Sequence, residues 1–187
     1  MLIRLKEKIE ANLGNSKEEF WQVLFTENQW IISEMISVPI SIFSSKAYYG
    51  GKNIFNEQGN LGDLLYRNQI TNNVVIVEIK TPMTAIIGSK YRNNTYLISD
   101  ELSGGINQLL TSRDSLRKEY YSIAVKSHQA FEVLEPKCLL IIGKLSVLDS
   151  EQIPSFEMFR NTLSNITVIT FDELLKKIDN LIGLFTQ

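Results

Sequence analysis

The sequence predicts an α/β fold in which helices pack on a central mixed β-sheet. Helix-like and strand-like segments alternate along much of the chain, and this order is typical of a sheet covered by helices. The hydrophobic fraction of 44% and the charged fraction of 21% are those of an ordinary globular protein. A chain of 187 residues buries one sizeable core. We therefore expect one main domain at residues 16–187, preceded by a lead-in helix at residues 1–15.

The first helix and the elements that follow it are predicted from periodicity. Residues 2–13 carry apolar side chains close to a 3.6-residue period, which indicates a helix. Ser16 and Glu19 have the spacing of a capping box, so a second helix is expected to begin near Lys17. Residues 39–49 are rich in β-branched and aromatic side chains, which favours a strand, and residues 50–62 are predicted to form a loop.

A β-hairpin is predicted in the middle of the chain. Residues 64–67 and 74–80 are expected to be strands, the polar run NQITNN joins them, and Pro82 stops the second strand. A long helix follows at residues 99–127, with Ser99 as its N-cap. The remaining predicted elements are a strand at 137–143, a helix at 151–163, a strand at 166–170 and a helix at 172–185.

Several classes of protein are excluded by composition. The longest apolar runs are far shorter than the ~20 residues that cross a bilayer, so no membrane partner is expected. The N-terminus lacks the continuous apolar segment of a secretory signal. Cys138 is the only cysteine, so no internal disulfide can form. These features predict a cytoplasmic protein.

The predicted hairpin brings three chemically active side chains together. If its turn is symmetric about residues 70 and 71, Asp63 lies opposite Glu78, and opposed residues point to the same face. Lys80 shares that face because strand side chains repeat with period two. Two close carboxylates repel each other unless a cation lies between them, and hard oxygen donors suit Mg²⁺ or Mn²⁺. We therefore expect a metal site at Asp63 and Glu78, with Lys80 acting on a water or a phosphate.

The alternative is that Glu78 and Lys80 are solvent-facing residues of an amphipathic strand, with Asp63 in a turn. The motif E-x-K on a strand is common, and a one-residue slip in register would separate the carboxylates.

The net charge of -2 argues against a protein that binds nucleic acid tightly over its whole surface. Any contact with DNA is therefore expected to be local. Basic residues gather in the middle of the chain and are interspersed with acidic ones, so they fit either a DNA contact or a solvated helix face. They are Lys80, Lys90, Arg92, Arg113, Arg117, Lys118 and Lys126.

Several separated motifs resemble one known family in its own order. They are GNLGDLLYRN (59–68), VVIVEIKTPMTAIIG (74–88), YRNNTYLISDELSGGINQLL (91–110), PKCLLIIGKL (136–145) and SFEMFRNTLSNITVITFDELLKKI (155–178). Together they resemble the nuclease domain of the Shedu family of bacterial anti-phage defence proteins, over roughly residues 17–182. The resemblance implies a restriction-endonuclease-like core of the PD-(D/E)XK superfamily.

Carried over residue by residue, the resemblance implies a specific active site. Asp63 matches the Asp of the PD motif, with Gly62 in place of the proline, and Glu78 and Lys80 match the (D/E)XK pair. Gln108 matches a polar residue on the helix beside the catalytic strands, although Ser112 stands where related members have a tyrosine. Glu19 matches a first-helix glutamate that completes the metal environment, and the neighbouring Glu18 is the alternative.

The resemblance implies a Mg²⁺-dependent endonuclease that hydrolyses DNA phosphodiester bonds in anti-phage defence. The other interpretation is a catalytically silent module that binds nucleic acid or assembles a larger defence protein. The resemblance also implies homo-oligomers. Family members carry a variable N-terminal sensing region, of which almost none is present here, so the chain is expected to be either a fragment or a minimal member.

Overall fold

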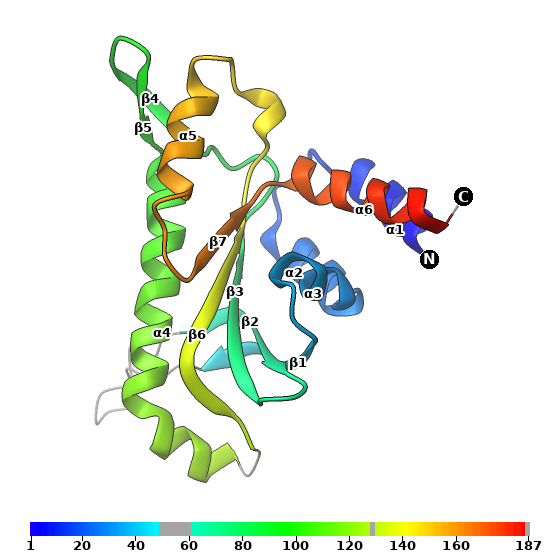
Figure 1. Cartoon of the computed structure of the whole chain (residues 1–187), viewed down its shortest axis with the longest axis vertical. Coiled ribbons are helices and arrows are strands. Elements are labelled where there is room, and N and C mark those ends of the chain that lie inside the picture. Colours follow the sequence, from blue (N-terminus) through cyan, green and yellow to red (C-terminus); the bar gives the residue numbers. More distant parts are fainter. Residues whose placement is uncertain (49–60, 128–129, 186–187) are drawn as a thin grey trace.

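A computed structural model describes residues 1–48, 61–127 and 130–185 (Figure 1). Most of the loop predicted at residues 50–62 lies outside the described residues. Leu61 and Gly62, predicted to end that loop, instead begin a strand.

Over the described residues, five strands form one mixed sheet in the order β1-β2-β3-β6-β7. The first three strands are antiparallel, whereas β3, β6 and β7 run parallel to one another. The prediction of a mixed sheet flanked by helices is therefore confirmed. The strands are β1 (Ile40–Tyr48), β2 (Leu61–Asn68), β3 (Asn73–Ile79), β6 (Glu132–Ile141) and β7 (Ile166–Ile169).

Helices cover both faces of this sheet (Figure 1). Side chains of α1, α2, α3 and α6 form one buried core with the sheet, and those of α4 and α5 form the other. No helix of the described residues combines the length and the apolar character that a membrane span needs. The helices are α1 (Leu2–Glu10), α2 (Glu18–Glu27), α3 (Trp30–Ile36), α4 (Asp100–Ser127), α5 (Gln152–Arg160) and α6 (Phe171–Phe185), with a 3-10 turn η1 at Leu145–Val147.

Strand β3 lies in the middle of the sheet and is buried on both faces. Val75, Val77 and Ile79 belong to the core under α1, α2 and α6, whereas Val74 and Ile76 belong to the core under α4. This alternation follows from the two-residue period of a strand. It places Glu78, two residues after Ile76, on the α4 side.

A second hairpin, β4 (Ile87–Arg92) and β5 (Thr95–Ile98), was not predicted from the sequence. It projects beyond the end of the sheet next to α5 (Figure 1). The Tyr96 backbone N–H donates to Oγ of Ser155, and Lys90 forms an ion pair with Glu151. Most of its side chains are exposed, so the apolar alternation that marks a half-buried strand is weak there.

The predicted helix starts have different outcomes. The backbone N–H of Leu102 donates to Oγ of Ser99 at 3.0 Å, so the predicted N-cap of α4 is confirmed. The predicted capping box of Ser16 and Glu19 is wrong, because α2 begins at Glu18, with Lys17 as an N-cap that makes no side-chain cap bond.

Arg160 connects α5 to α6 through two hydrogen bonds. Its Nη1 and Nη2 atoms donate to the two carboxylate oxygens of Glu173 at 2.9 and 2.7 Å. Burial alone would raise the pKa of Glu173, but the bonds from Arg160 and from the Thr170 backbone outweigh burial, and the pKa lies below its usual value.

Candidate active site

The hairpin of β2 and β3 has the register that a symmetric turn predicts. Leu64 pairs with Val77 and Arg67 pairs with Val74. Continued one step beyond the Leu64 pair, this register brings Asp63 next to Glu78. The two carboxylates therefore belong to the same end of the hairpin, and the charge of Asp63 acts on Glu78.

Two hydrogen bonds fix the carboxylate of Asp63. Its Oδ2 accepts the backbone N–H of Ile79 at 2.8 Å, and its Oδ1 accepts Nε2 of Gln22 at 2.6 Å. Burial raises the pKa of Asp63, and the bond from Ile79 and the charge of Lys80 only partly offset this. Gln22 was not predicted from the sequence, since it lies on α2, far along the chain from the hairpin.

Glu78 is almost completely buried, with 2% of its surface exposed. Its burial and the nearby charge of Asp63 raise its pKa to about 7, against the opposing charge of Lys80. The interpretation of Glu78 as a solvent-facing strand residue is therefore wrong. The site concentrates negative charge in a place with little water.

Lys80 lies between two carboxylates. Its Nζ atom is 3.0 Å from Oε1 of Glu78 and 3.4 Å from Oε1 of Glu18, and only 19% of the side chain is exposed. Burial alone would lower the pKa of Lys80, but the surrounding carboxylates, Glu78 first, raise it. Lys80 is thus held as a cation.

The chain segment after Lys80 is fixed against β6. The Lys80 backbone N–H donates to the Ile141 carbonyl at 2.8 Å, and the Gly143 N–H donates to the Thr81 carbonyl at 3.0 Å. Gly143 has a φ of +59°, and a Cβ atom there would lie 2.6 Å from both Ile86 Cγ2 and the Thr84 carbonyl oxygen. Only glycine fits at position 143, where the segment after Lys80 packs against the end of β6, without backbone strain.

The structure places Glu18, rather than the predicted Glu19, beside Lys80. Because α2 begins at Glu18, residues 18 and 22 lie one above the other on the same helix face and both point to the site. Glu19 is exposed on a different side of the helix. Glu18 is therefore the α2 carboxylate beside Lys80, and the role of Glu19 as a metal ligand stays a prediction.

Gln108 lies on α4, the helix that packs over this face of the sheet. Gly105, one turn earlier, lies against the side chain of Leu140, and Leu140 is the β6 partner of Glu78. Gln108 is half-buried, and its side chain forms no hydrogen bond or ion pair with another described residue. Its role in catalysis stays a prediction.

The donor set fits a magnesium ion held by few protein ligands. Within the described residues, no group of three or more His, Cys, Asp and Glu side chains is arranged to hold a metal ion. Mg²⁺ usually keeps several waters and is bound through one or two carboxylates together with substrate phosphates. Asp63 and Glu78 supply such a pair. Burial raises the pKa of both carboxyl groups, and a bound cation would offset this cost by stabilising their charged forms.

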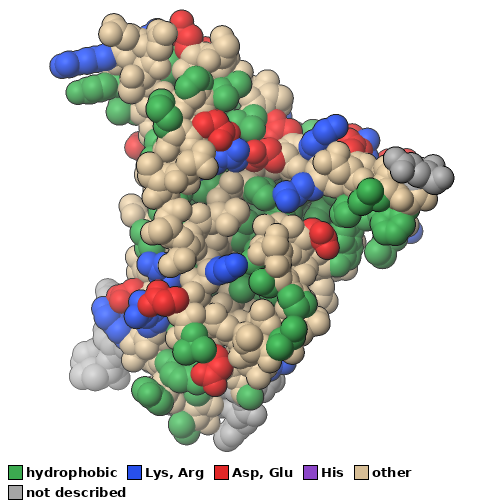
Figure 2. Space-filling view, in the orientation of Figure 1, with side chains coloured by type: hydrophobic (Ala, Val, Ile, Leu, Met, Phe, Trp, Pro, Cys, Tyr) green, Lys and Arg blue, Asp and Glu red, His purple; other side chains and the backbone are tan. Residues whose placement is uncertain are grey.

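The basic residues in the middle of the chain are largely matched by acidic ones. Arg117 forms an ion pair with Glu135, and Lys118 forms one with Asp114. Figure 2 likewise shows Lys and Arg side chains mixed with Asp and Glu on the visible face. This arrangement favours the interpretation of a solvated helix face for these two residues. The side chain of Lys126 lies outside the described ones.

Comparison with known proteins identifies the family. Residues 15–175 match the family described as Shedu protein SduA, C-terminal. The chain is 39% identical over 183 residues to the Shedu protein SduA of Bacillus cereus (strain B4264), a match that covers 94% of this chain and 48% of that relative. The chain thus spans about half the length of the curated relative that it matches. With most of its length matched by the family and a relative of this identity, the chain belongs to the Shedu family, to whose C-terminal part it corresponds.

Proposed function

We propose that this domain is a Mg²⁺-dependent endonuclease that hydrolyses DNA phosphodiester bonds in bacterial anti-phage defence. The observation that supports the proposal best is the convergence of Asp63, Glu78 and Lys80 at the carboxyl end of β3. Asp63 and Glu78 would hold the ion. A bound Mg²⁺ would stabilise charge on the phosphate and increase the acidity of a water molecule.

The side chains of this chain divide the remaining work. Gln22 and the Ile79 N–H orient the carboxylate of Asp63 before substrate arrives. Lys80 carries a raised pKa and therefore has no free lone pair to accept a proton at neutral pH. Its role is to offset the negative charge that builds on the phosphate during attack.

Plasmid nicking tests this proposal. The purified protein should nick or cut supercoiled plasmid in Mg²⁺ or Mn²⁺ and be inert in EDTA. Lys80→Met should abolish the reaction, because it removes the cation but retains the length of the side chain. Lys177→Met, at an exposed position of α6, is the matched control and should cleave normally. Full cleavage by folded Lys80→Met protein, as judged by circular dichroism, would exclude the mechanism.

DNA binding is measured separately, without metal. Asp63→Asn removes one negative charge near the phosphate, so affinity should hold or rise while cleavage disappears. Wild-type protein that binds DNA and never cuts it under any metal condition would favour a silent binding module. Self-association, the other property that the family resemblance implies, is tested by sedimentation of the purified domain.

A further inference from the structure

A cavity of about 380 Å³ opens beside Asp63, between α2 and the antiparallel strands. Gln22 and Asp63, which are hydrogen-bonded to each other in the candidate active site, form part of its lining. Val23 and Thr26 of α2, Ser45 of β1 and Leu64 of β2 also line it. The cavity and the proposed catalytic centre therefore share a wall.

The lining combines apolar walls with hydrogen-bonding groups. Val23 is 56% exposed, which is unusual for a helix residue next to a core, whereas Leu64, which also lines the cavity, is 1% exposed. The Thr26 hydroxyl is already used, since it donates to the Gln22 carbonyl at 2.8 Å. Apolar walls with a few polar groups are typical of small-molecule sites, whose volumes are ~300–1,000 Å³.

The charge of the cavity decides which part of a nucleotide it suits. Its lining includes two carboxylates, Asp63 and Glu27, and none of the described side chains that line it is a cation. A phosphate would be repelled there. A nucleobase is neutral, has apolar faces and carries hydrogen-bonding groups on its edge, so it matches both the charge and the lining.

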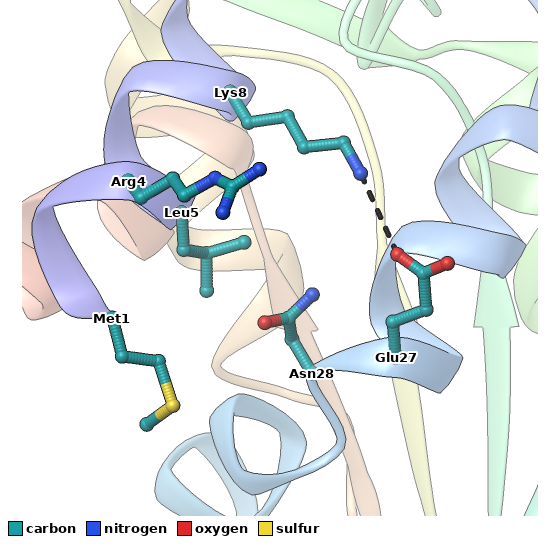
Figure 3. Close-up of a pocket in the computed structure, with 6 residues that line it drawn as sticks. All are labelled: Met1, Arg4, Leu5, Lys8, Glu27 and Asn28. Atoms are coloured by element: carbon teal, nitrogen blue, oxygen red, sulfur yellow. Dashed lines mark hydrogen bonds and ion pairs between the residues drawn. The ribbon is translucent and has the colours of Figure 1, made fainter.

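Cations lie just past the cavity. Glu27 also lines a second cavity, of about 550 Å³, together with Arg4, Lys8 and Asn28. Figure 3 shows Arg4 and Lys8 extending from α1 towards the end of α2, where Lys8 pairs with Glu27 at 3.5 Å. Gln22 and Glu27 are separated along α2 by about 7.5 Å. The cavity beside Asp63 and the cations Arg4 and Lys8 of the second cavity thus meet at Glu27.

We propose that the cavity beside Asp63 binds one unstacked nucleobase of the strand being cut. The domain then acts on DNA in which a nucleotide next to the scissile phosphate is unpaired or turned out of the helix, because a stacked base cannot enter a side pocket. This proposal rests on the proposed nuclease function and names its substrate class.

Binding without metal tests the base pocket directly. The probes are a labelled oligothymidylate and an abasic strand of equal length, which has the same phosphates and no bases. Wild-type protein should bind oligothymidylate at least about fivefold more tightly, since contacts to bases add to contacts with phosphates. Val23→Met combined with Ser45→Met narrows the cavity from both walls and should remove this preference while leaving affinity for the abasic strand unchanged.

The matched control places the same substitutions elsewhere. Val125→Met with Ser89→Met changes two exposed positions outside the cavity and should keep the preference. Equal binding of both strands by wild-type protein, or a preference that persists in the narrowed variant, would overturn the proposal.

Cleavage separates this proposal from the nuclease function itself. A duplex with one unpaired nucleotide should be nicked several-fold faster than the fully paired duplex by wild-type protein, and at equal rates by the narrowed variant. Base-preferring binding without any cleavage would refute the nuclease function and support the pocket. Cleavage without base preference in either assay would support the nuclease and refute the pocket.

Discussion

Gln22 donates a hydrogen bond from Nε2 to Oδ1 of Asp63 at 2.6 Å, and this bond joins α2 to the central hairpin. The second oxygen of Asp63 is held by the Ile79 N–H. Both oxygens are therefore oriented by donors from different elements, so the carboxylate has a defined direction before a cation or a substrate arrives.

Gln22→Leu should lower the nicking rate by roughly 10- to 100-fold, the usual effect of removing a group that orients a metal ligand. The apparent affinity for Mg²⁺ should fall with it, because Asp63 loses one of its two fixed donors. Rates measured over a Mg²⁺ titration test this. Gln69→Leu, whose amide bonds the Ile40 carbonyl far from the site, should behave as wild type. An unchanged Mg²⁺ dependence in Gln22→Leu would contradict a positioning role.

Glu18→Gln and Glu19→Gln form a matched pair of adjacent substitutions. Glu18 pairs with Lys80 while partly exposed to solvent, and such pairs contribute ~0–1 kcal/mol, so its loss should slow nicking by up to about fivefold. Glu19→Gln should have no effect. If Glu18→Gln instead lowers the nicking rate more than about tenfold and also lowers the apparent affinity for Mg²⁺, Glu18 is a metal ligand.

Gly143→Ala should destabilise the fold by about 2–4 kcal/mol, through left-handed backbone strain together with the clash at Ile86 and Thr84. Urea denaturation measures this. Gly104→Ala is the control, since a Cβ atom added there would meet nothing within 4 Å and the residue sits within α4. Replacing this helical glycine by alanine should raise the free energy of unfolding by ~0.5–1 kcal/mol. Similar unfolding midpoints for both variants would show that the backbone around Gly143 shifts to accommodate the added Cβ atom.

The ion pair of Arg160 and Glu173 predicts a dependence of stability on pH. The folded pKa of Glu173 is depressed, so its contribution is fully present above the unfolded value of ~4.3 and is lost as pH falls through the folded pKa. Glu173→Gln should therefore be less stable than wild type at pH 6, by roughly 1–3 kcal/mol, and the difference should shrink towards pH 3. Denaturation at several pH values tests this. A difference that grows on acidification would contradict it.

The sequence predicted the site where its geometry is local. Asp63 and Glu78 belong to one hairpin with a symmetric polar turn, and the observed register follows from that symmetry. Buried apolar residues on both faces of β3 then hold the register, because a slip would bring Glu78 into the other core.

The parts of the site on α2 were harder to predict, because they reach the hairpin only through tertiary packing. The predicted start near Lys17 agrees with the observed start at Glu18, but a helix start alone does not show which of two adjacent glutamates faces Lys80. Gln22 could have been found only from the i, i+4 spacing that it shares with Glu18. The short helix α3 and the exposed hairpin of β4 and β5 were not predicted. Neither segment has apolar residues at regular spacing over a long enough stretch to be recognised as a helix or a strand.

The contact between Gln22 and Asp63 spans 41 residues of sequence, whereas the hairpin that joins Asp63 to Glu78 is local. Local hairpins form within about 1–10 μs, and contacts between distant residues form later because a longer loop must close first. We therefore expect the two carboxylates to meet early in folding, when neither has the donors of α2 around it. Their mutual repulsion then opposes the nascent hairpin. The arrival of α2 adds the Gln22 bond to Asp63 and completes the candidate site, so a chain stalled before that step would already be collapsed yet would lack the oriented carboxylate.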